Sequence, residues 1–355
     1  MAINFSETLR KIANRPSGCE TTPKSETGKT LPYRGAAQGN HVPEPVRDGV
    51  SVSDAAKKME EARPGEDNTG IYRQAAALAR GLLGRDLREK ENDIHELSAL
   101  LNKMIGFLRR GGEDIIAATF EGAVGNEDYL ASHSVNTCVY SIIMGLARGY
   151  DDESMEALAL SALFHDVGMV YYMDLVNKPR RLVPAECEEI KQHTTKGFEL
   201  LRLAGDILPK EAPYAALGHH ERADGTGYPN GAESGAIDEI TSIVGLADVY
   251  EAMSHSRGYR AGLAPYNAVK EIISCKSSYE YALLKILIER IGMFPPGSIV
   301  KLNNNRVAEV IKLNSQNPTR PVVRMLYDSD GRAIRRPELL DLASNFGTYI
   351  LSGDC

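Results

Sequence analysis

Apolar side chains recur with a helical period through most of residues 113–290 of this 355-residue chain. Segments such as SMEALALSALFHDVG and AIDEITSIVGLADVYEAMSH place apolar residues three and four positions apart, which gives each helix an apolar face. Several of these segments end at glycine, a common helix terminator. The pattern predicts a mainly α fold, in which a helical bundle over residues 113–290 buries these faces against one another.

The pattern changes after Ile291. GSIVKLNNNRVAEVIKLN and TRPVVRMLYDSDGRAI are short alternating runs, broken by asparagine, proline and the turn sequence DSDG. Such runs are typical of β-hairpins. The sequence therefore predicts a small β-rich subdomain over residues 291–355, following the bundle.

The start of the chain has a different composition. Residues 15–67 are rich in proline, glycine, serine, threonine and charged residues, with few large apolar side chains to bury. A segment of this kind cannot offset the entropy cost of ordering, so residues 1–67 are predicted to be disordered.

Residues 68–112 have a helical pattern again, with apolar residues at a spacing of three and four: Ile94, Leu97, Leu101, Met104 and Leu108. This spacing indicates either a coiled-coil seam between the two chains of a homodimer or a helix face packed on the next domain. The repeat extends backward only through Leu87 and Leu83, so both interpretations stay open.

Charge and cysteine content exclude several classes of protein. The net charge of −7 argues against binding of a nucleic acid polymer as the main function. The five cysteines are scattered and odd in number, which predicts a reducing, cytoplasmic location without a disulfide framework. The sequence begins without the apolar core of a signal peptide and has no run of apolar residues long enough to cross a membrane, so no membrane span is expected.

Histidines and aspartates gather in the predicted bundle. Six of the eight histidines fall there, and five of them, about one for each expected helix, are candidate ligands: His133, His165, His193, His219 and His220. Asp166 and Asp248 lie in otherwise apolar helical segments, where an unpaired carboxylate is costly. Each residue alone could be a satisfied core or cap residue. Together they predict a metal site, because bundles build such sites from side chains that point inward from facing helices.

The residue types restrict the metal. Imidazoles and carboxylates without thiolates suit Fe, Mn, Zn or Co better than Ca or Mg, and we expect Fe or Mn. Seven candidate ligands exceed the needs of one tetrahedral ion, so two divalent ions are expected, with Asp166 as a bridge and candidate catalytic residue. Two ions about 3.5–4 Å apart can share a water, lower its pKa toward 7 and assist an in-line phosphoryl displacement. That chemistry is phosphoester hydrolysis.

Four stretches together resemble one family: HD at His165-Asp166, HTTKG at His193, HHERADGTGYPNG from His219, and GLADVYEAM at Asp248. They resemble the HD-GYP family of metal-dependent phosphodiesterases, within the HD-domain phosphohydrolase superfamily. The similarity covers about residues 128–260 and extends more loosely into the β-rich end of the chain. It implies a role in bacterial signal transduction, as a hydrolase that opens cyclic di-GMP to linear pGpG, and in some members cuts on to GMP, by a metal-bridged hydroxide.

The resemblance also implies roles for single residues. It makes metal ligands of seven positions: His133, His165, Asp166, His193, His219, His220 and Asp248. Gly227, Tyr228 and Pro229 form the GYP triplet, whose loop is expected to shape the rim of the pocket or a surface for a GGDEF-type or other signalling protein. Tyr228 is also predicted to contact the substrate.

Two arginines match the basic positions of the family's RPYK-like element. Arg257 and Arg260 are therefore predicted to clamp a phosphate or a guanine of the substrate, since the arginine fork suits phosphate geometry. The alternative interpretation is that both are solvated surface residues.

Two positions depart from the family pattern. Family members with three metals carry a glutamate where this chain has Tyr129, so two ions are expected here. Met169 stands where the family commonly has the lysine of HD-x-G-K. Methionine lacks the positive charge and the hydrogen-bond donors of that lysine. The change is expected to weaken transition-state stabilisation by about 2–4 kcal/mol.

Three functions are compatible with these residues. The first is a metal-dependent cyclic di-GMP phosphodiesterase. The second is a catalytically weakened HD-GYP module that binds a nucleotide or a protein partner and signals through the N-terminal helix. The third is a phosphohydrolase acting on another nucleotide, such as cyclic GMP-AMP, and the GYP loop argues against a mononucleotide substrate.

Overall fold

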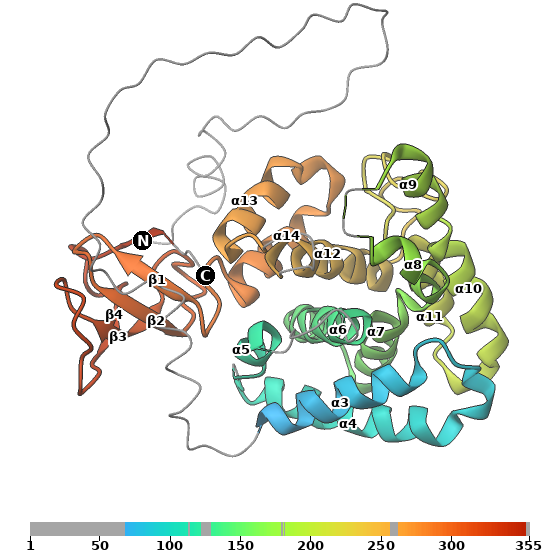
Figure 1. The fold of residues 1–355 in the computed structure, drawn as a ribbon, viewed down its shortest axis with the longest axis horizontal. Helices are drawn as coiled ribbons and strands as arrows, with labels where there is room; N and C mark the ends of the chain where they lie inside the picture. The colour runs from blue at the N-terminus through green and yellow to red at the C-terminus, as the bar shows by residue number, and fades with distance from the viewer. Residues whose placement is uncertain are drawn as a thin grey trace, which may run out of the picture.

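The computed structural model of the chain describes residues 68–112, 114–121, 129–178, 180, 182–255 and 262–352. The segment predicted to be disordered, residues 1–67, lies outside this part of the chain, as do Arg257 and Arg260. A helical domain and a smaller sheet lie side by side (Figure 1). The predicted mainly α fold with a β-rich C-terminal part is confirmed. The predicted domain limits stay predictions.

Most of the helices follow one another with short connections, and a longer one runs over residues 219–238. In chain order the longer ones are α3 (Asn68–Leu82), α4 (Glu91–Arg109), α5 (Asp114–Glu121), α6 (Tyr129–Arg148), α7 (Asp152–Phe164), α10 (His193–Ala204), α11 (Glu211–Gly218), α12 (Glu239–Ser254) and α13 (Pro265–Ser274). Shorter turns are η3 (Val167–Tyr172), α8 (Met173–Val176), α9 (Pro184–Ile190), α14 (Tyr281–Ile286) and η6 (Leu287–Ile291).

Local sequence sets the start of the key helices. The Asp151 carboxylate accepts a hydrogen bond from the backbone N–H of Ser154 at 2.9 Å and caps α7. Asp238 caps α12 in the same way through the N–H of Thr241, also at 2.9 Å. These caps fix the first residues of two helices that position predicted metal ligands: α7 ends next to His165, and α12 contains Asp248.

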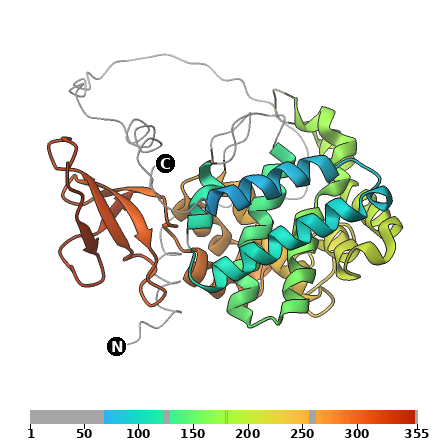
Figure 2. The same cartoon turned by 90° about the horizontal axis from the view of Figure 1, so that it is seen from below.

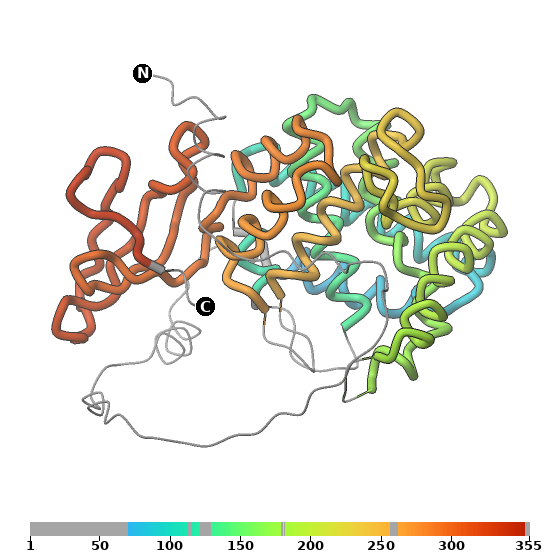
Figure 3. Tube along the Cα trace, turned by 90° about the horizontal axis from the view of Figure 1, so that it is seen from above, coloured from blue at the N-terminus to red at the C-terminus, as the bar shows by residue number. Residues whose placement is uncertain are grey.

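The helical domain is built in three layers around α6. Helix α6 packs against α3, α7 and α12, and its residues from Leu130 to Gly145 are buried. Helices α3 and α4 cover one side of α6 and α7 (Figure 2), and α12–α14 cover the opposite side (Figure 3). The centre of the domain is therefore closed to solvent on both faces.

The apolar stripe of α4 faces this core. Ile94, Leu97, Leu101 and Met104 are each at most 2% exposed in the single chain. This burial fits the second of the two interpretations of the stripe, a helix face packed on the next domain. A homodimer through another surface stays a prediction.

The C-terminal sheet is antiparallel, with strand order β4-β3-β2-β1-β5. Its strands are β1 (Ile299–Leu302), β2 (Val307–Lys312), β3 (Val322–Tyr327), β4 (Leu339–Asp341) and β5 (Ile350–Ser352). Val300 pairs with Ala308, and Val310 with Val323, and these apolar side chains are fully buried. No helix in the described part of the chain has the length and apolar character needed to cross a membrane.

Candidate metal centre

The structure brings together all seven residues predicted as metal ligands. They come from five helices: α6 (His133), the end of α7 (His165, Asp166), the start of α10 (His193), the turn after α11 (His219, His220) and α12 (Asp248). Six of the seven are at most 8% exposed, and His220 is half-buried. The cluster is therefore formed by tertiary packing, with no single motif supplying it.

Two glycines let the backbones approach closely enough to form the cluster. A Cβ atom at Gly168 would lie 2.1 Å from the carbonyl oxygen of His193, so the turn after Asp166 rests directly on the start of α10. A Cβ atom at Gly245 would lie 2.3 Å from the carbonyl oxygen of His219. Only glycine fits at either position, and the two contacts bring the carboxylates of α7 and α12 beside the histidines.

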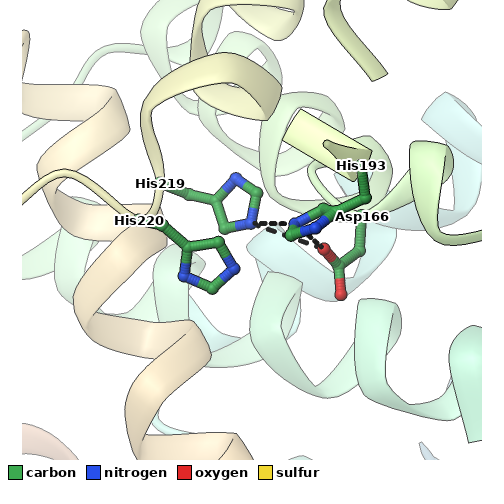
Figure 4. Close-up of side chains that lie close together, drawn as sticks. All are labelled: Asp166, His193, His219 and His220. Carbon is green, nitrogen blue, oxygen red and sulfur yellow. Dashed lines mark hydrogen bonds and ion pairs between the residues drawn. The ribbon is translucent and has the colours of Figure 1, made fainter. Parts of the chain in front are cut away.

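Asp166 faces a first group of three histidines, and the four side chains point toward one another (Figure 4). Its Oδ1 atom lies 3.2 Å from Nε2 of His193 and 3.4 Å from Nε2 of His219. The two Nε2 atoms are 3.3 Å apart. With His220, these residues offer ligand atoms that all lie within 4.8 Å of one another.

The other oxygen of Asp166 faces a second group. Its Oδ2 atom lies 3.4 Å from Nε2 of His133 and 3.8 Å from Nε2 of His165. These three residues also offer ligand atoms within 4.8 Å of one another. Asp166 therefore presents one carboxylate oxygen to each group, which is the geometry of a residue that can bridge two ions.

Asp248 closes the cluster opposite Asp166. Its Oδ1 atom lies 3.2 Å from Nε2 of His133 and 3.9 Å from Nε2 of His165. Its Oδ2 atom lies 3.9 Å from Nδ1 of His220. Asp248 thus also reaches residues of both groups.

Backbone carbonyls orient three of the histidines. Nδ1–H of His165 donates to the carbonyl of Ala162 at 2.7 Å, and Nδ1–H of His193 donates to that of Ile190 at 2.6 Å. Nδ1–H of His219 donates to the carbonyl of Ala216 at 3.0 Å. Because a carbonyl only accepts hydrogen bonds, the proton of each neutral ring is held on Nδ1 and Nε2 is left free as a ligand atom.

The cluster contains polar atoms that protein groups do not satisfy. Nε2 of His165 and Oδ1 of Asp166 are buried and have no hydrogen-bond partner among the described residues. Leaving such groups unpaired costs about 1–3 kcal/mol each. Bound cations would remove this cost, and an imidazole and carboxylate set without thiolate suits first-row transition metals. The residues fit a metal centre.

The same part of the chain matches known families. Residues 113–282 match the HD domain, and residues 299–352 match the KOW domain associated with the HD domain. This chain carries an HD domain. The predicted resemblance to HD-GYP phosphodiesterases is confirmed by this match and by the relatives that follow.

Two curated relatives of the HD domain act on cyclic dinucleotides. A cyclic di-GMP phosphodiesterase of Pseudomonas aeruginosa is 24% identical over 61% of this chain and 52% of its own length. A 3'3'-cGAMP-specific phosphodiesterase of Vibrio cholerae is 31% identical over 42% of this chain and 33% of its own length. The chain thus spans about half or less of these curated relatives.

A solved structure supports the fold. A protein of Bdellovibrio bacteriovorus described as HDG"Y"P matches with a TM-score of 0.53 and 18% identity, over 66% of this chain and 76% of that chain. The helical bundle predicted from the sequence is therefore the HD fold.

Burial and charge act in opposite directions on the ionisable groups of the HD domain. Burial raises the pKa of Asp166 and of Asp248. The surrounding histidines lower both pKa values by more than burial raises them, so both lie below their usual range. Burial lowers the pKa of His133, whereas the facing carboxylates raise it well above its ordinary value. The carboxylates therefore favour positive charge at this position.

The pKa values of the other histidines shift in either direction, according to whether burial or a facing carboxylate has the larger effect. Burial opposes protonation of His193, but the facing carboxylate of Asp166, 3.2 Å from Nε2, outweighs it and the pKa of His193 is raised. Burial lowers the pKa of His165 to about 4, and burial with the neighbouring His219 lowers the pKa of His220 well below its ordinary value. His165 and His220 are neutral at pH 7 and ready to act as ligands.

The GYP loop packs against the cluster. The Tyr228 ring stacks on the His220 ring, with centroids 4.6 Å apart, and the Tyr228 N–H donates to the His220 carbonyl at 3.2 Å. The backbone N–H groups of Asn230 and Ala232 donate to the Glu221 carboxylate at 2.7 and 2.9 Å. The loop is thus held over one edge of the metal-ligand cluster, with Pro229 exposed.

Gly227 is required by this packing. A Cβ atom at that position would lie 2.5 Å from the His220 carbonyl oxygen and from the Arg222 nitrogen. The first residue of the triplet therefore lets the loop fold back on the histidine pair.

The two departures from the family pattern lie close to the cluster. The Tyr129 ring stacks on the His133 ring, with centroids 5.6 Å apart. Met169 is half-buried in η3, and its N–H donates to the Asp166 carbonyl at 2.9 Å. Met169 therefore follows the shared carboxylate by one turn and brings no charge to it.

Two side chains near the cluster were missed from the sequence. Glu251 is 2% exposed and its carboxylate accepts from Nδ1 of His133 at 2.5 Å. It follows Asp248 by three residues in GLADVYEAM, a spacing that places both on one helix face and could have signalled it. Lys191 has its ammonium 5.3 Å from the centre of the Tyr228 ring, and its sequence context gave no such signal.

Proposed function

We propose that this chain is a metal-dependent phosphodiesterase that hydrolyses cyclic di-GMP to linear pGpG. One observation carries the proposal: the two oxygens of Asp166 face two separate groups of histidines, within a buried site. This arrangement supports two ions that act together on one phosphodiester. The names of the relatives support the class of substrate.

The proposed ions are Fe or Mn. One would be held by His133, His165, Asp166 and Asp248, and the other by Asp166, His193, His219 and His220. When bound, the pair would supply an acidified water and neutralise charge on the phosphodiester. Asp166 would contribute a ligand to both ions, and the carbonyl-bound Nδ1 protons keep the histidine Nε2 atoms directed inward.

The rim of the site is proposed to hold the substrate. The Tyr228 ring offers a face for a guanine base, and Lys191 offers a positive charge for a phosphate. The buried helices exclude bulk water from the reacting phosphate, which strengthens the electrostatic attraction within the site. The predicted clamp of Arg257 and Arg260 remains part of this proposal.

Met169 supports a second candidate, a weakened enzyme that acts mainly as a nucleotide-binding signalling module. The cluster is intact, but no lysine follows Asp166 to face the phosphate. The name of the Vibrio cholerae relative supports 3'3'-cGAMP as an alternative substrate of the same site. These candidates differ in turnover and substrate, so one assay separates them.

The assay measures metal content and reaction products on the same sample of full-length chain. We expect Mn- or Fe-loaded protein to convert cyclic di-GMP to pGpG, identified by mass spectrometry, with cyclic GMP-AMP tested in parallel. His165→Ala should abolish turnover, whereas His95→Ala, at an exposed position of α4, should not. Binding of cyclic di-GMP without turnover under any metal would refute the enzyme and favour the signalling module.

The exposed part of the GYP loop is proposed to contact a signalling protein, such as one of the GGDEF type. Pro229 and Asn230 are exposed, whereas the Tyr228 ring turns toward His220. Substituting both exposed residues by alanine should weaken such an interaction and leave hydrolysis intact. Loss of hydrolysis in that variant would instead assign the whole loop to the active site.

A further inference from the structure

Glu251 is a buried carboxylate outside the two groups of candidate ligands. It lies on α12 and is 2% exposed. Both of its oxygens are occupied: Oε2 accepts from Nδ1 of His133 at 2.5 Å, and Oε1 accepts from the side-chain amide of Asn136 at 3.0 Å. A buried carboxylate is tolerated when it is paired and hydrogen-bonded in this way.

Its contact with His133 differs from those of the other oriented histidines. His165, His193 and His219 lie at helix ends and donate to backbone carbonyls three residues earlier. His133 lies inside α6 and is held instead by a side chain from another helix. Because a carboxylate only accepts here, the proton stays on Nδ1 and Nε2 faces Asp166 and Asp248.

The contact continues to the N-terminal helices. Asn136 follows His133 by one turn of α6, and its Oδ1 atom accepts a hydrogen bond from the hydroxyl of Tyr72 at 2.7 Å. Tyr72 lies on α3, is 3% exposed and is outside residues 113–282, the part matched to the HD domain. The carboxylate of Glu251 only accepts, so the NH₂ group of Asn136 must face it. The amide oxygen of Asn136 then faces the other way and accepts from the hydroxyl of Tyr72.

We propose that Glu251 is a positioning residue for His133, and that Tyr72 and Asn136 hold Glu251 in place, so that helix α3 is coupled to the metal centre. The inference rests on the proposed function, because it takes His133 as a ligand. The four residues form one hydrogen-bonded chain from α3 through α6 to α12. A displacement of α3 would release the amide of Asn136 and, through it, the orientation of the His133 ring.

The test uses Tyr72→Phe, Glu251→Gln and the double variant in the full chain. Tyr140→Phe is the matched control, because it removes a buried hydroxyl that bonds to the side-chain hydroxyl of Thr119 and to none of the four residues of the chain. The first readout is Mn²⁺ affinity by calorimetry, and the second is the ¹⁵N shift of the His133 ring in metal-free protein. Thermal unfolding of each variant monitors stability separately.

We expect Glu251→Gln to lower Mn²⁺ affinity by about 10- to 100-fold and to change the His133 shift. Tyr72→Phe should lower the affinity by about three- to tenfold, with little further effect once Glu251 is changed. Tyr140→Phe should leave both readouts unchanged. Equal affinities for wild type, Tyr72→Phe and Tyr140→Phe would overturn the coupling to α3.

The test also separates the two proposals. If the wild-type protein binds Mn²⁺ and cleaves cyclic di-GMP, and the variants bind Mn²⁺ equally well, the inference is overturned and the proposed function stands. Wild-type protein that binds no divalent metal would overturn both. Lower stability without a change in affinity would assign Tyr72 and Glu251 a purely structural role and also overturn the inference.

Discussion

Asp166 and Asp248 approach the same nitrogen of His133, with Oδ2 of Asp166 at 3.4 Å and Oδ1 of Asp248 at 3.2 Å from Nε2. Asp166 lies in the turn after α7 and Asp248 lies on α12, and both carboxylates face one imidazole nitrogen. Only Asp166 also lies within 3.5 Å of His193 and His219. The two aspartates are therefore expected to differ in how many ions depend on them.

Asp166→Asn should remove the shared ligand and lower the metal content from two ions per chain to one or none. Asparagine keeps the size of the side chain but loses the charge that holds both ions. Turnover should fall by about 10³-fold or more. Metal analysis and a steady-state assay measure the two effects, with Asp174→Asn on the exposed surface of α8 as the control. Two tightly bound ions in Asp166→Asn would contradict the bridging role.

Metal binding should release protons at neutral pH. The pKa values of His133 and His193 are raised by the facing carboxylates, so a cation must displace protons that these rings hold more tightly than an ordinary histidine does. Affinity should therefore rise with pH until these protons are lost. His165, with its pKa lowered to about 4, contributes no proton above about pH 5. Calorimetry in buffers of different ionisation enthalpy counts the protons, and a pH-independent affinity between pH 6 and 8 would contradict the assignment.

Gly168→Ala should disrupt the centre without touching a ligand. The added Cβ would lie 2.1 Å from the His193 carbonyl oxygen and 2.6 Å from the Gly197 nitrogen, so the start of α10 must move. We expect a loss of stability of about 1–3 kcal/mol or more and weaker metal binding. Gly81→Ala, with nothing within 4 Å of the new atom, should be neutral or stabilising by up to about 1 kcal/mol. Equal unfolding temperatures for the two variants would contradict this packing argument.

The fold and the candidate ligands could be predicted because both leave local traces. Helical periods mark the apolar faces, and histidines or aspartates inside apolar runs such as SALFHDVGMV need partners. The stripe of α4 shows where such reasoning ends, because a period identifies an apolar face but not the surface that covers it. Burial of Ile94 and Leu97 within the chain required the structure.

The residues missed from the sequence share one property. Glu251, Asn136 and Lys191 are polar residues in helical or turn sequences, where a solvated position is the ordinary expectation. Their contacts with His133, Tyr72 and Tyr228 join residues far apart in the chain. The spacing of Glu251 from Asp248 indicates only a shared helix face, and the contacts themselves follow from the packing of α3, α6 and α12 and of the GYP loop.

Met169→Lys should raise turnover. The new ammonium would follow Asp166 by one turn of η3 and supply a charge toward the phosphate, at a half-buried position that tolerates a long side chain. A contact worth about 2–4 kcal/mol corresponds to a gain of roughly 30- to 1,000-fold in kcat. Met173→Lys, also half-buried and four residues further on, is the control. Unchanged kcat in Met169→Lys would show that this position does not limit the reaction.

Lys191→Gln should raise the KM for cyclic di-GMP by about tenfold and leave kcat nearly unchanged, because its charge lies at the rim of the cluster. Its ammonium lies 5.3 Å from the Tyr228 ring centre and pairs with Glu188 at 2.7 Å. A tenfold change in KM corresponds to about 1.4 kcal/mol for one charge contact to a phosphate. Because salt screens such a contact, added salt should reduce the difference in KM between the wild type and Lys191→Gln.

Lys196→Gln gives a closely matched control for that experiment. Lys196 also pairs with a glutamate three residues away, Glu199 at 2.9 Å, and is similarly exposed, but in the described part of the chain no hydrogen bond or ion pair joins it to the GYP loop. Loss of a surface ion pair alone should be the same in both variants, at most about 1 kcal/mol of stability. A KM that rises equally in the two variants would assign the effect to general surface charge, whereas a rise only in Lys191→Gln locates the phosphate beside Tyr228.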